Sequence, residues 1–103
     1  MKISYRNKRL RKLIEQYTEA KGRFGDQNAR KIIQRMNELQ AAPTLDDMPP
    51  AARPHPLTGD RKGQYAVDLK HPSRLLFEPV DPEDPHDRRT IKAICIIEIT
   101  DYH

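Results

Sequence analysis

The first quarter of the chain carries apolar residues at the spacing of a short strand and then at the spacing of a helix. Ile3 and Tyr5 alternate with polar residues, which predicts a first strand. Asn7 follows as a suitable helix N-cap, and Gly22 and Gly25 provide the end of the helix and a tight reversal. The apolar stripe between them consists of Leu10, Leu13, Ile14 and Tyr17. The pattern therefore predicts a strand followed by one helix.

A second helical pattern begins after these glycines. Asp26 can cap this helix, and Pro43 stops it. Its apolar stripe consists of Ala29, Ile32, Ile33, Met36 and Leu39. The two helices are expected to form a hairpin whose apolar stripes must cover another apolar surface. A sheet is the natural candidate.

The middle of the chain changes from an extended loop to a strand hairpin. Residues 43–63 contain five prolines and little periodicity, which predicts a loop. From residue 64 the alternation resumes, with Tyr65, Val67 and Leu69 on one face and Ala66 and Asp68 on the other. Residues 70–73 form the expected turn, and residues 74–78 can return antiparallel.

The last third contains an acidic insertion and an apolar strand. Residues 79–90 hold three prolines and four acidic residues, so we expect a mobile excursion rather than regular structure. Ile91 to Ile99 is largely apolar on both faces, which favours a central position in the sheet. Together the elements predict an α+β fold, with two N-terminal helices packed on one face of a small, twisted, mostly antiparallel sheet.

Composition limits the class of protein further. A chain of 103 residues supports one domain, spanning 1–103. The longest apolar run is Ala93–Ile97, too short for a membrane span, and the charged N-terminus does not resemble a secretory signal, so we expect a cytoplasmic protein without membrane association. Cys95 is the single cysteine, which excludes an internal disulfide. The absence of a CxxC motif or a Cys/His cluster argues against a metal site.

Positive charge is concentrated in the first part of the chain. Residues 1–42 hold 11 Lys and Arg against 4 Asp and Glu, whereas residues 43–103 hold 8 against 11. Lys31 and Arg35 form a like-charged i,i+4 pair, which is unfavourable when exposed. Further cations near the first predicted helix start are Lys8, Arg9, Arg11 and Lys12. This pattern favours a polyanionic or acidic partner, and the alternative is a solvated basic face.

Three local motifs point to one family. His55 begins the run HPLTGDRKGQYAV, Arg74 and Phe77 lie in the following predicted strand, and the chain ends in DYH at residues 101–103. This set resembles the HigB branch of the RelE/ParE superfamily of type II toxin-antitoxin toxins, and the element order matches over nearly the whole chain. The resemblance implies a RelE-like, microbial-RNase-like fold.

The resemblance also implies a function and partners. HigB toxins are ribosome-dependent endoribonucleases that cut mRNA in the ribosomal A site, so the partners would be mRNA and ribosomal RNA. A cognate HigA-like helix-turn-helix antitoxin would hold the toxin inactive and connect it indirectly to operator DNA. Two alternatives stay open. One is a ParE-like inhibitor of gyrase without hydrolytic activity, and the other is a degenerate member that only binds an antitoxin.

The residue chemistry is compatible with RNA cleavage. Cleavage through the 2′-hydroxyl needs a base, an acid for the leaving oxygen and cations at the phosphate, but no metal or other cofactor. Two histidines can divide the acid and base roles in either order. The resemblance places the catalytic residues on His55, Asp101, Tyr102 and His103. Arg61, Lys62 and Arg74 are the candidate phosphate-binding residues, and ordinary surface charge is the alternative for them.

Overall fold

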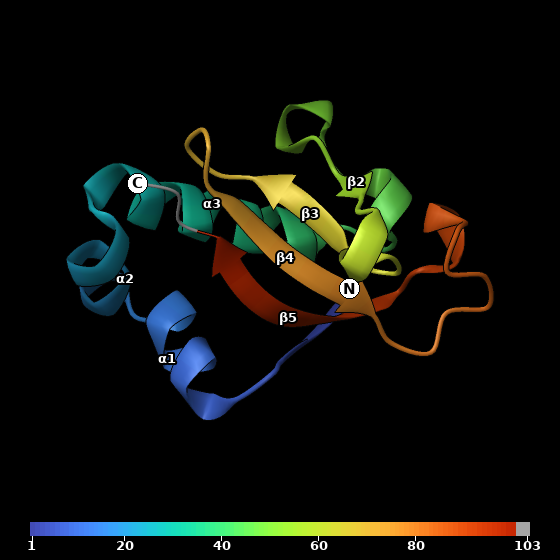
Figure 1. Ribbon diagram of the computed structural model, residues 1–103, viewed down its shortest axis with the longest axis horizontal. Helices are drawn as coiled ribbons and strands as arrows, with labels where there is room; N and C mark the ends of the chain where they lie inside the picture. The colour runs from blue at the N-terminus through green and yellow to red at the C-terminus, as the bar shows by residue number, and fades with distance from the viewer. Residues whose placement is uncertain (101–103) are drawn as a thin grey trace.

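The structure is a computed structural model, and it describes residues 1–100. Over these residues the chain forms three α-helices and a five-stranded sheet, with short 3-10 turns in the loops (Figure 1). The helices are α1 (Lys8–Glu15), α2 (Tyr17–Phe24) and α3 (Asp26–Ala41). The strands are β1 (Lys2–Tyr5), β2 (His55–Pro56), β3 (Tyr65–Asp68), β4 (Arg74–Pro79) and β5 (Ala93–Thr100).

The sheet confirms the predicted α+β class. Its strand order is β1-β5-β4-β3-β2, and β1 pairs with β5 in parallel while the other pairs are antiparallel. The hairpin of β3 and β4 has the predicted connection through residues 70–73. β5 lies between β1 and β4, as expected from its two apolar faces, although it begins at Ala93 and not at Ile91.

The core lies between the α-helices and one face of the sheet. Alternate strand residues such as Tyr65, Val67, Leu75 and Phe77 are buried there. The helices contribute Ile14, Ala20, Ala29, Ile32, Met36 and Leu39 to the same cluster. Figure 1 is viewed from the other side of the sheet, with α3 behind β3 and β4. We call this opposite side of the sheet the outer face.

The prediction of a single first helix is wrong, because the chain breaks it at Gln16. The backbone of Gln16 is extended, with φ −106° and ψ 109°, so Gln16 ends α1 and begins α2. Asn7 caps α1 as predicted, since its side chain accepts the Leu10 N–H at 2.8 Å. The break lets α2 turn and pack along α3, where it buries Ala20. Three helices therefore cover the sheet in the described chain instead of two.

The start of α3 also differs from the prediction. Gly25 precedes the helix with φ 87°, a left-handed conformation that favours glycine, and it occupies the N-cap position expected for Asp26. The Asp26 carboxylate instead accepts from Tyr17 and from Arg30. It therefore joins the start of α3 to the start of α2.

Arg35 on α3 is buried, so the predicted like-charge repulsion with Lys31 is not the dominant interaction. Its guanidinium pairs with Glu38 at 2.8 Å. It also donates to the backbone oxygens of Asp68 at 2.6 Å and Ala51 at 3.2 Å. Arg35 therefore joins α3 to β3 and to the loop that precedes His55.

The loop of residues 43–63 is more structured than expected. It contains three short 3-10 turns and the two-residue strand β2, in which His55 pairs with Ala66 of β3. His55 is consequently held at the edge of the sheet and not in a free loop. The pairing of His55 with Ala66 therefore determines on which face of the sheet the His55 imidazole lies.

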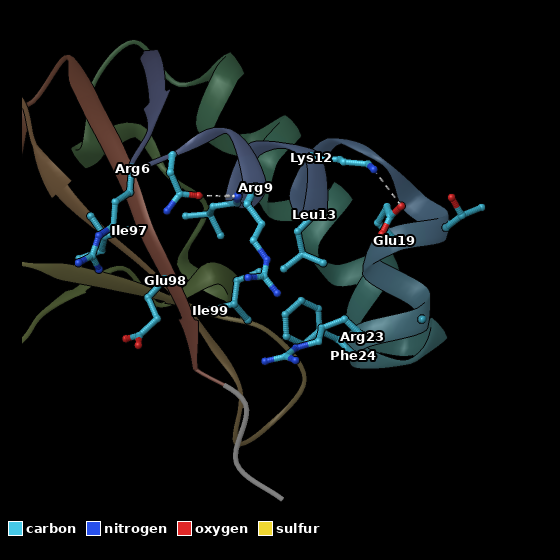
Figure 2. Close-up of a pocket in the computed structure, with 14 residues that line it drawn as sticks. Arg6, Arg9, Lys12, Leu13, Glu19, Arg23, Phe24, Ile97, Glu98 and Ile99 are labelled. Atoms are coloured by element: carbon cyan, nitrogen blue, oxygen red, sulfur yellow. Dashed lines mark hydrogen bonds and ion pairs between the residues drawn. The ribbon is translucent and has the colours of Figure 1, made fainter.

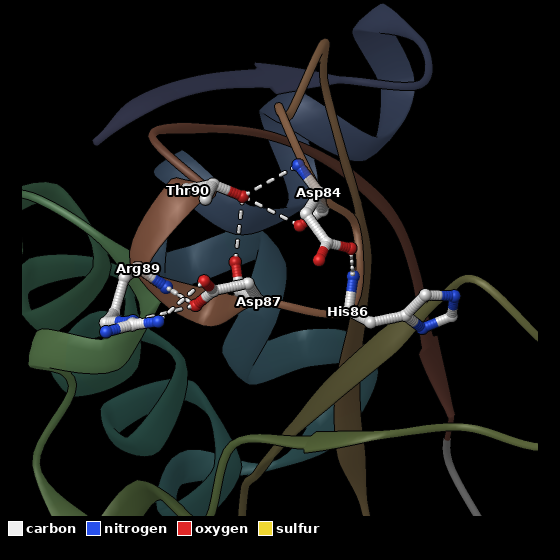
Figure 3. A network of polar contacts seen from close by, with 5 residues as sticks. All are labelled: Asp84, His86, Asp87, Arg89 and Thr90. Atoms are coloured by element: carbon white, nitrogen blue, oxygen red, sulfur yellow. Dashed lines mark hydrogen bonds and ion pairs between the residues drawn. The ribbon is translucent and has the colours of Figure 1, made fainter.

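The acidic excursion is also folded back on itself, contrary to the expectation of no regular structure. Asp87 caps a 3-10 turn at Arg88–Thr90 and binds the Arg89 side chain at 3.0 Å. Thr90 donates to the Asp84 carbonyl at 2.7 Å, and the whole network is visible in Figure 3. The Tyr65 hydroxyl donates to the Pro85 carbonyl at 2.8 Å. The excursion is thus tied to the sheet.

Candidate functional site

The strand register places His55 in a row of residues across the outer face. His55 pairs with Ala66, Ala66 with Leu76, and Leu76 with Glu98. Residues that are partners in a sheet project from the same face, and the neighbours of Ala66 on β3 project into the helix-covered core. His55 and Glu98 therefore belong to the face that the α-helices leave uncovered.

His55 is oriented by a backbone contact. Its Nδ1 lies 2.6 Å from the carbonyl oxygen of Arg53. A carbonyl oxygen only accepts, so Nδ1 carries the proton and a neutral ring has its lone pair on Nε2. Arg53 itself has φ 48°, a left-handed conformation that is uncommon for an arginine. The arrangement leaves Nε2 as the atom of His55 that can take or give a proton.

Arg61 reaches the outer face from the turn Gly59–Arg61. One terminal nitrogen of its guanidinium donates to Gln64 at 3.0 Å, and the other forms an ion pair with Glu98. The two side chains are 43% and 41% exposed. Exposed pairs of this kind typically contribute about 0–1 kcal/mol to stability. The main effect of the contact is to hold the guanidinium beside the His55 row.

The other two predicted phosphate-binding residues lie nearby in the fold but form no comparable contact among the described residues. Arg74 begins β4, and its register partners are Asp68 and Thr100, so it lies on the outer face one row from Leu76. Its side chain is exposed. Lys62 follows the turn that carries Arg61 and is also exposed. Of the three cations, only Arg61 is fixed by side-chain partners within residues 1–100.

Three predicted catalytic residues lie outside the described residues. These are Asp101, Tyr102 and His103. Their predicted roles stay predictions. Among residues 1–100, no group of three His, Cys, Asp or Glu side chains is arranged to hold a metal ion, and no helix there is long and apolar enough to cross a membrane.

Glu98 is a site residue that the sequence analysis missed. Strict alternation from Ile94 and Ile96 would point Glu98 into the core. Phe77 pairs with Ile96 and Leu76 pairs with Glu98, so β5 contains one extra residue, Ile97, at this point. The bulge reverses the alternation and turns Glu98 to the outer face. The available signal was a single acidic residue within an isoleucine-rich strand.

A groove runs from this end of β5 to the helices α1 and α2 (Figure 2). Its volume is about 1120 Å³. Its charged lining residues are Arg6, Arg9, Lys12, Glu19, Arg23 and Glu98, so cations outnumber acids. Its apolar lining residues are Leu10, Leu13, Phe24, Ile97 and Ile99. In Figure 2 Arg9, Leu13 and Phe24 extend into the space between β5 and the helices.

The fold defines a class of small α+β proteins with α-helices on one face of a mostly antiparallel sheet, and here the other face carries His55, Arg74 and Glu98 around buried Ala66 and Leu76. Solved structures of other proteins share that fold, among them a toxin. A YoeB/ParE toxin from Agrobacterium tumefaciens is 16% identical over 100% of both chains, with a TM-score of 0.62. A histidine-to-glutamine mutant of YafQ from E. coli is 19% identical over 96% of this chain and 90% of its own, with a TM-score of 0.61.

A third neighbour was solved with a second protein. It is the YoeB–YefM complex from Staphylococcus aureus, which is 17% identical over 100% of this chain and 97% of the matched chain, with a TM-score of 0.59. No family model matches the sequence, and no curated protein matches it either. At these identities the likeness establishes the fold.

Proposed function

We propose that this protein is the toxin of a type II toxin-antitoxin system and an endoribonuclease that acts on mRNA. The observation that carries the proposal is the His55 imidazole, whose Nδ1 is held by the Arg53 carbonyl and whose Nε2 has no hydrogen-bond partner within residues 1–100, on the same face as Arg61 and Arg74. The YoeB/ParE toxin among the fold neighbours supports the same class. The resemblance of the HPLTGDRKGQYAV and DYH motifs to HigB supports mRNA as the substrate.

The proposed chemistry is attack of an RNA 2′-hydroxyl on the neighbouring phosphate, which forms a 2′,3′-cyclic phosphate, breaks the P–O5′ bond and releases a 5′-hydroxyl end. His55 and His103 act as base and acid, in either order, and Asp101 and Tyr102 assist them. Arg61, Lys62 and Arg74 stabilise the charge that develops on the phosphate oxygens. The reaction needs no metal or other cofactor, because each proton transfer has a side chain to perform it.

We further propose that cleavage takes place in the cytoplasm in the A site of the ribosome, with the basic surface of α1 and α2 against ribosomal RNA. Arg9 and Arg23 in the groove of Figure 2 supply positive charge for such contacts. The partner that inhibits the toxin is a HigA-like antitoxin, through which the complex would reach operator DNA. A fold neighbour in complex with YefM supports a protein partner.

The test is to map mRNA 5′ ends produced by the purified protein on translating ribosomes. We expect codon-phased cuts from the wild type and a loss of about 100-fold or more for His55→Ala, as is typical when a general acid or base is removed. His55→Asn is the matched control, because its amide N–H can replace Nδ1–H at the Arg53 carbonyl but cannot transfer a proton. It should fold like the wild type and cleave like His55→Ala.

Other outcomes identify the rival functions. Unchanged messages together with stalled DNA replication in cells would indicate gyrase inhibition. No effect on growth and no cleavage would indicate a degenerate protein that only binds an antitoxin. Full activity of His55→Asn would contradict the role of His55 in proton transfer.

A further inference from the structure

Glu98 and Gln64 hold two different corners of the Arg61 guanidinium. Gln64 accepts from one terminal nitrogen at 3.0 Å, and Glu98 accepts from the other. A guanidinium has five N–H donors in one plane, so these two contacts leave three donors for another ligand. Phosphate oxygens match two donors on one edge of the fork. Arg61 can therefore keep both protein partners while it binds a phosphate.

The position of Glu98 depends on a break in the sheet. The bulge at Ile97 turns Glu98 to the outer face and returns Ile99 to the core. A bulge interrupts the backbone ladder, and an ion pair that is about half exposed adds little stability in return. Bulges are common beside functional sites, where they redirect a side chain. Orientation of Arg61 accounts for the arrangement better than stability does.

We propose that Glu98 is a positioning residue that fixes Arg61 for a phosphate of the bound RNA. The inference rests on the proposed nuclease function and adds to it a residue that neither the family resemblance nor the sequence pattern singled out. Glu98 also places a negative charge near the phosphate site. This charge repels the substrate phosphate and lowers substrate affinity. The contact of Glu98 with Arg61 fixes the guanidinium in the geometry that the transition state requires.

This mechanism predicts an unusual division between kcat and KM. Glu98→Ala should lower kcat about tenfold or more, because a misplaced cationic group stabilises the transition state less well. KM should stay the same or fall, since a negative charge has been removed from the RNA-binding face. Partial unfolding would also lower the apparent kcat, so the folded fraction of each variant is measured by circular dichroism and kcat is given per folded molecule. Glu98→Gln keeps an acceptor oxygen for Arg61 and should restore most of kcat.

A double-mutant cycle tests whether Glu98 acts through Arg61. In the Arg61→Ala background, Glu98→Ala should have no further effect on kcat. Glu78→Ala is the matched control, because Glu78 is an exposed acid on the same face, opposite Cys95 of β5, and has no contact with Arg61 among the described residues. It should leave kcat unchanged. Independent, multiplying effects of the Glu98 and Arg61 substitutions would overturn the proposal.

A measurement on the free protein separates this inference from the proposed function. The guanidinium N–H resonances of Arg61 should be protected from exchange in the wild type and in Glu98→Gln, and they should lose that protection in Glu98→Ala. If the wild type does not cleave mRNA but this pattern is found, the nuclease proposal fails and the orientation of Arg61 by Glu98 stands. Unchanged protection of Arg61 in a folded Glu98→Ala protein would overturn the positioning role, whatever the activity.

Discussion

His55 and Glu98 lie in one cross-strand row of the outer face, with Ala66 and Leu76 between them. Three strand spacings separate their backbones by about 14 Å. The Arg61 side chain reaches Glu98 from the turn that follows β2, so its positive charge lies on the same surface as the imidazole. That surface therefore combines an imidazole with a cation that is held by two side chains.

Removal of the cations in the groove should weaken binding to RNA or ribosomes. Arg9→Ala with Arg23→Ala should lower affinity, and the slope of log K against log salt should fall by about one for each phosphate that is no longer neutralised. Arg30→Ala is the control, because Arg30 lies on α3, outside the groove lining, and pairs with Asp26 at 2.9 Å. Titrations at several salt concentrations measure both quantities. An equal effect of Arg30→Ala would assign the binding to overall charge.

Truncation of Arg35 should destabilise the protein more than truncation of an exposed charged residue does. Arg35→Ala leaves the Asp68 and Ala51 carbonyls without this donor and removes the partner of Glu38, so we expect a loss of about 2–3 kcal/mol. Lys31→Ala, one turn earlier on α3, should change the free energy of unfolding by about 0.5 kcal/mol or less. Urea denaturation compares the two. Similar losses of unfolding free energy in the two variants would mean that the buried contacts of Arg35 contribute little to stability.

Loss of the Tyr65 hydroxyl should release the acidic excursion from the sheet. Tyr65→Phe keeps the stacked contact with Phe77, whose ring centroid is 6.2 Å away, but loses the hydrogen bond to Pro85. We expect a loss of about 1 kcal/mol in the free energy of unfolding near neutral pH. Amide exchange around residues 84–87 should rise at the same time. Unchanged exchange there would show that the excursion is held by other contacts.

The same residue predicts part of the alkaline behaviour. Burial raises the pKa of the Tyr65 phenol above its ordinary value, which means that the folded protein favours the protonated form. The stability that the protonated Tyr65 phenol contributes is fully present below the pKa of this phenol in the unfolded chain. It is lost as the pH rises through the pKa of the phenol in the folded protein. Tyr65→Phe should therefore lose less stability than the wild type at high pH. Tyr5, whose pKa is also raised by burial, accounts for some remaining dependence.

The Asp87–Arg89 pair predicts a titration change at low pH. Hydrogen bonds from the Arg89 side chain and backbone lower the pKa of Asp87, so any stability from this contact is present above the unfolded pKa and is lost as the pH falls through the folded pKa. Arg89→Ala should raise the pKa of the Asp87 carboxyl, measured by NMR titration. Arg88→Ala is the control in the same turn and should leave the Asp87 titration in place. An unchanged Asp87 titration in Arg89→Ala would refute the assignment.

Local sequence patterns predicted those helices and strands that depend mainly on their own residues. Alternation through Tyr65 and Val67 was enough for the hairpin, and the apolar run at β5 indicated its central position. The break at Gln16 was not predictable in this way, because neither glycine nor proline marks it. The pairing of Arg35 with β3 and the edge strand at His55 depend on contacts between distant segments.

Only those residues of the candidate site that belong to a recognisable sequence motif could be predicted. His55 was found from the family resemblance, and Arg61 and Arg74 from the chemistry of phosphate binding. The strand register of His55 and Arg74 and the contact of Arg61 with Glu98 support a common face. Glu98 could not be found from alternation, since the bulge at Ile97 changes the phase of β5 between two apolar positions. The position of this bulge depends on how β5 pairs with β4, and the sequence of β5 alone does not determine that pairing.

The position of β5 also has a consequence during synthesis. β5 follows the other strands in the chain yet lies between β1 and β4, and β1 pairs with it across about 90 residues of sequence. A nascent chain that has exposed only residues 1–92 can form the β3–β4 hairpin but cannot join it to β1. Glu98 is also missing at that stage, and Arg61 has not yet gained its partner. Emergence of β5 thus couples completion of the fold to assembly of the outer face.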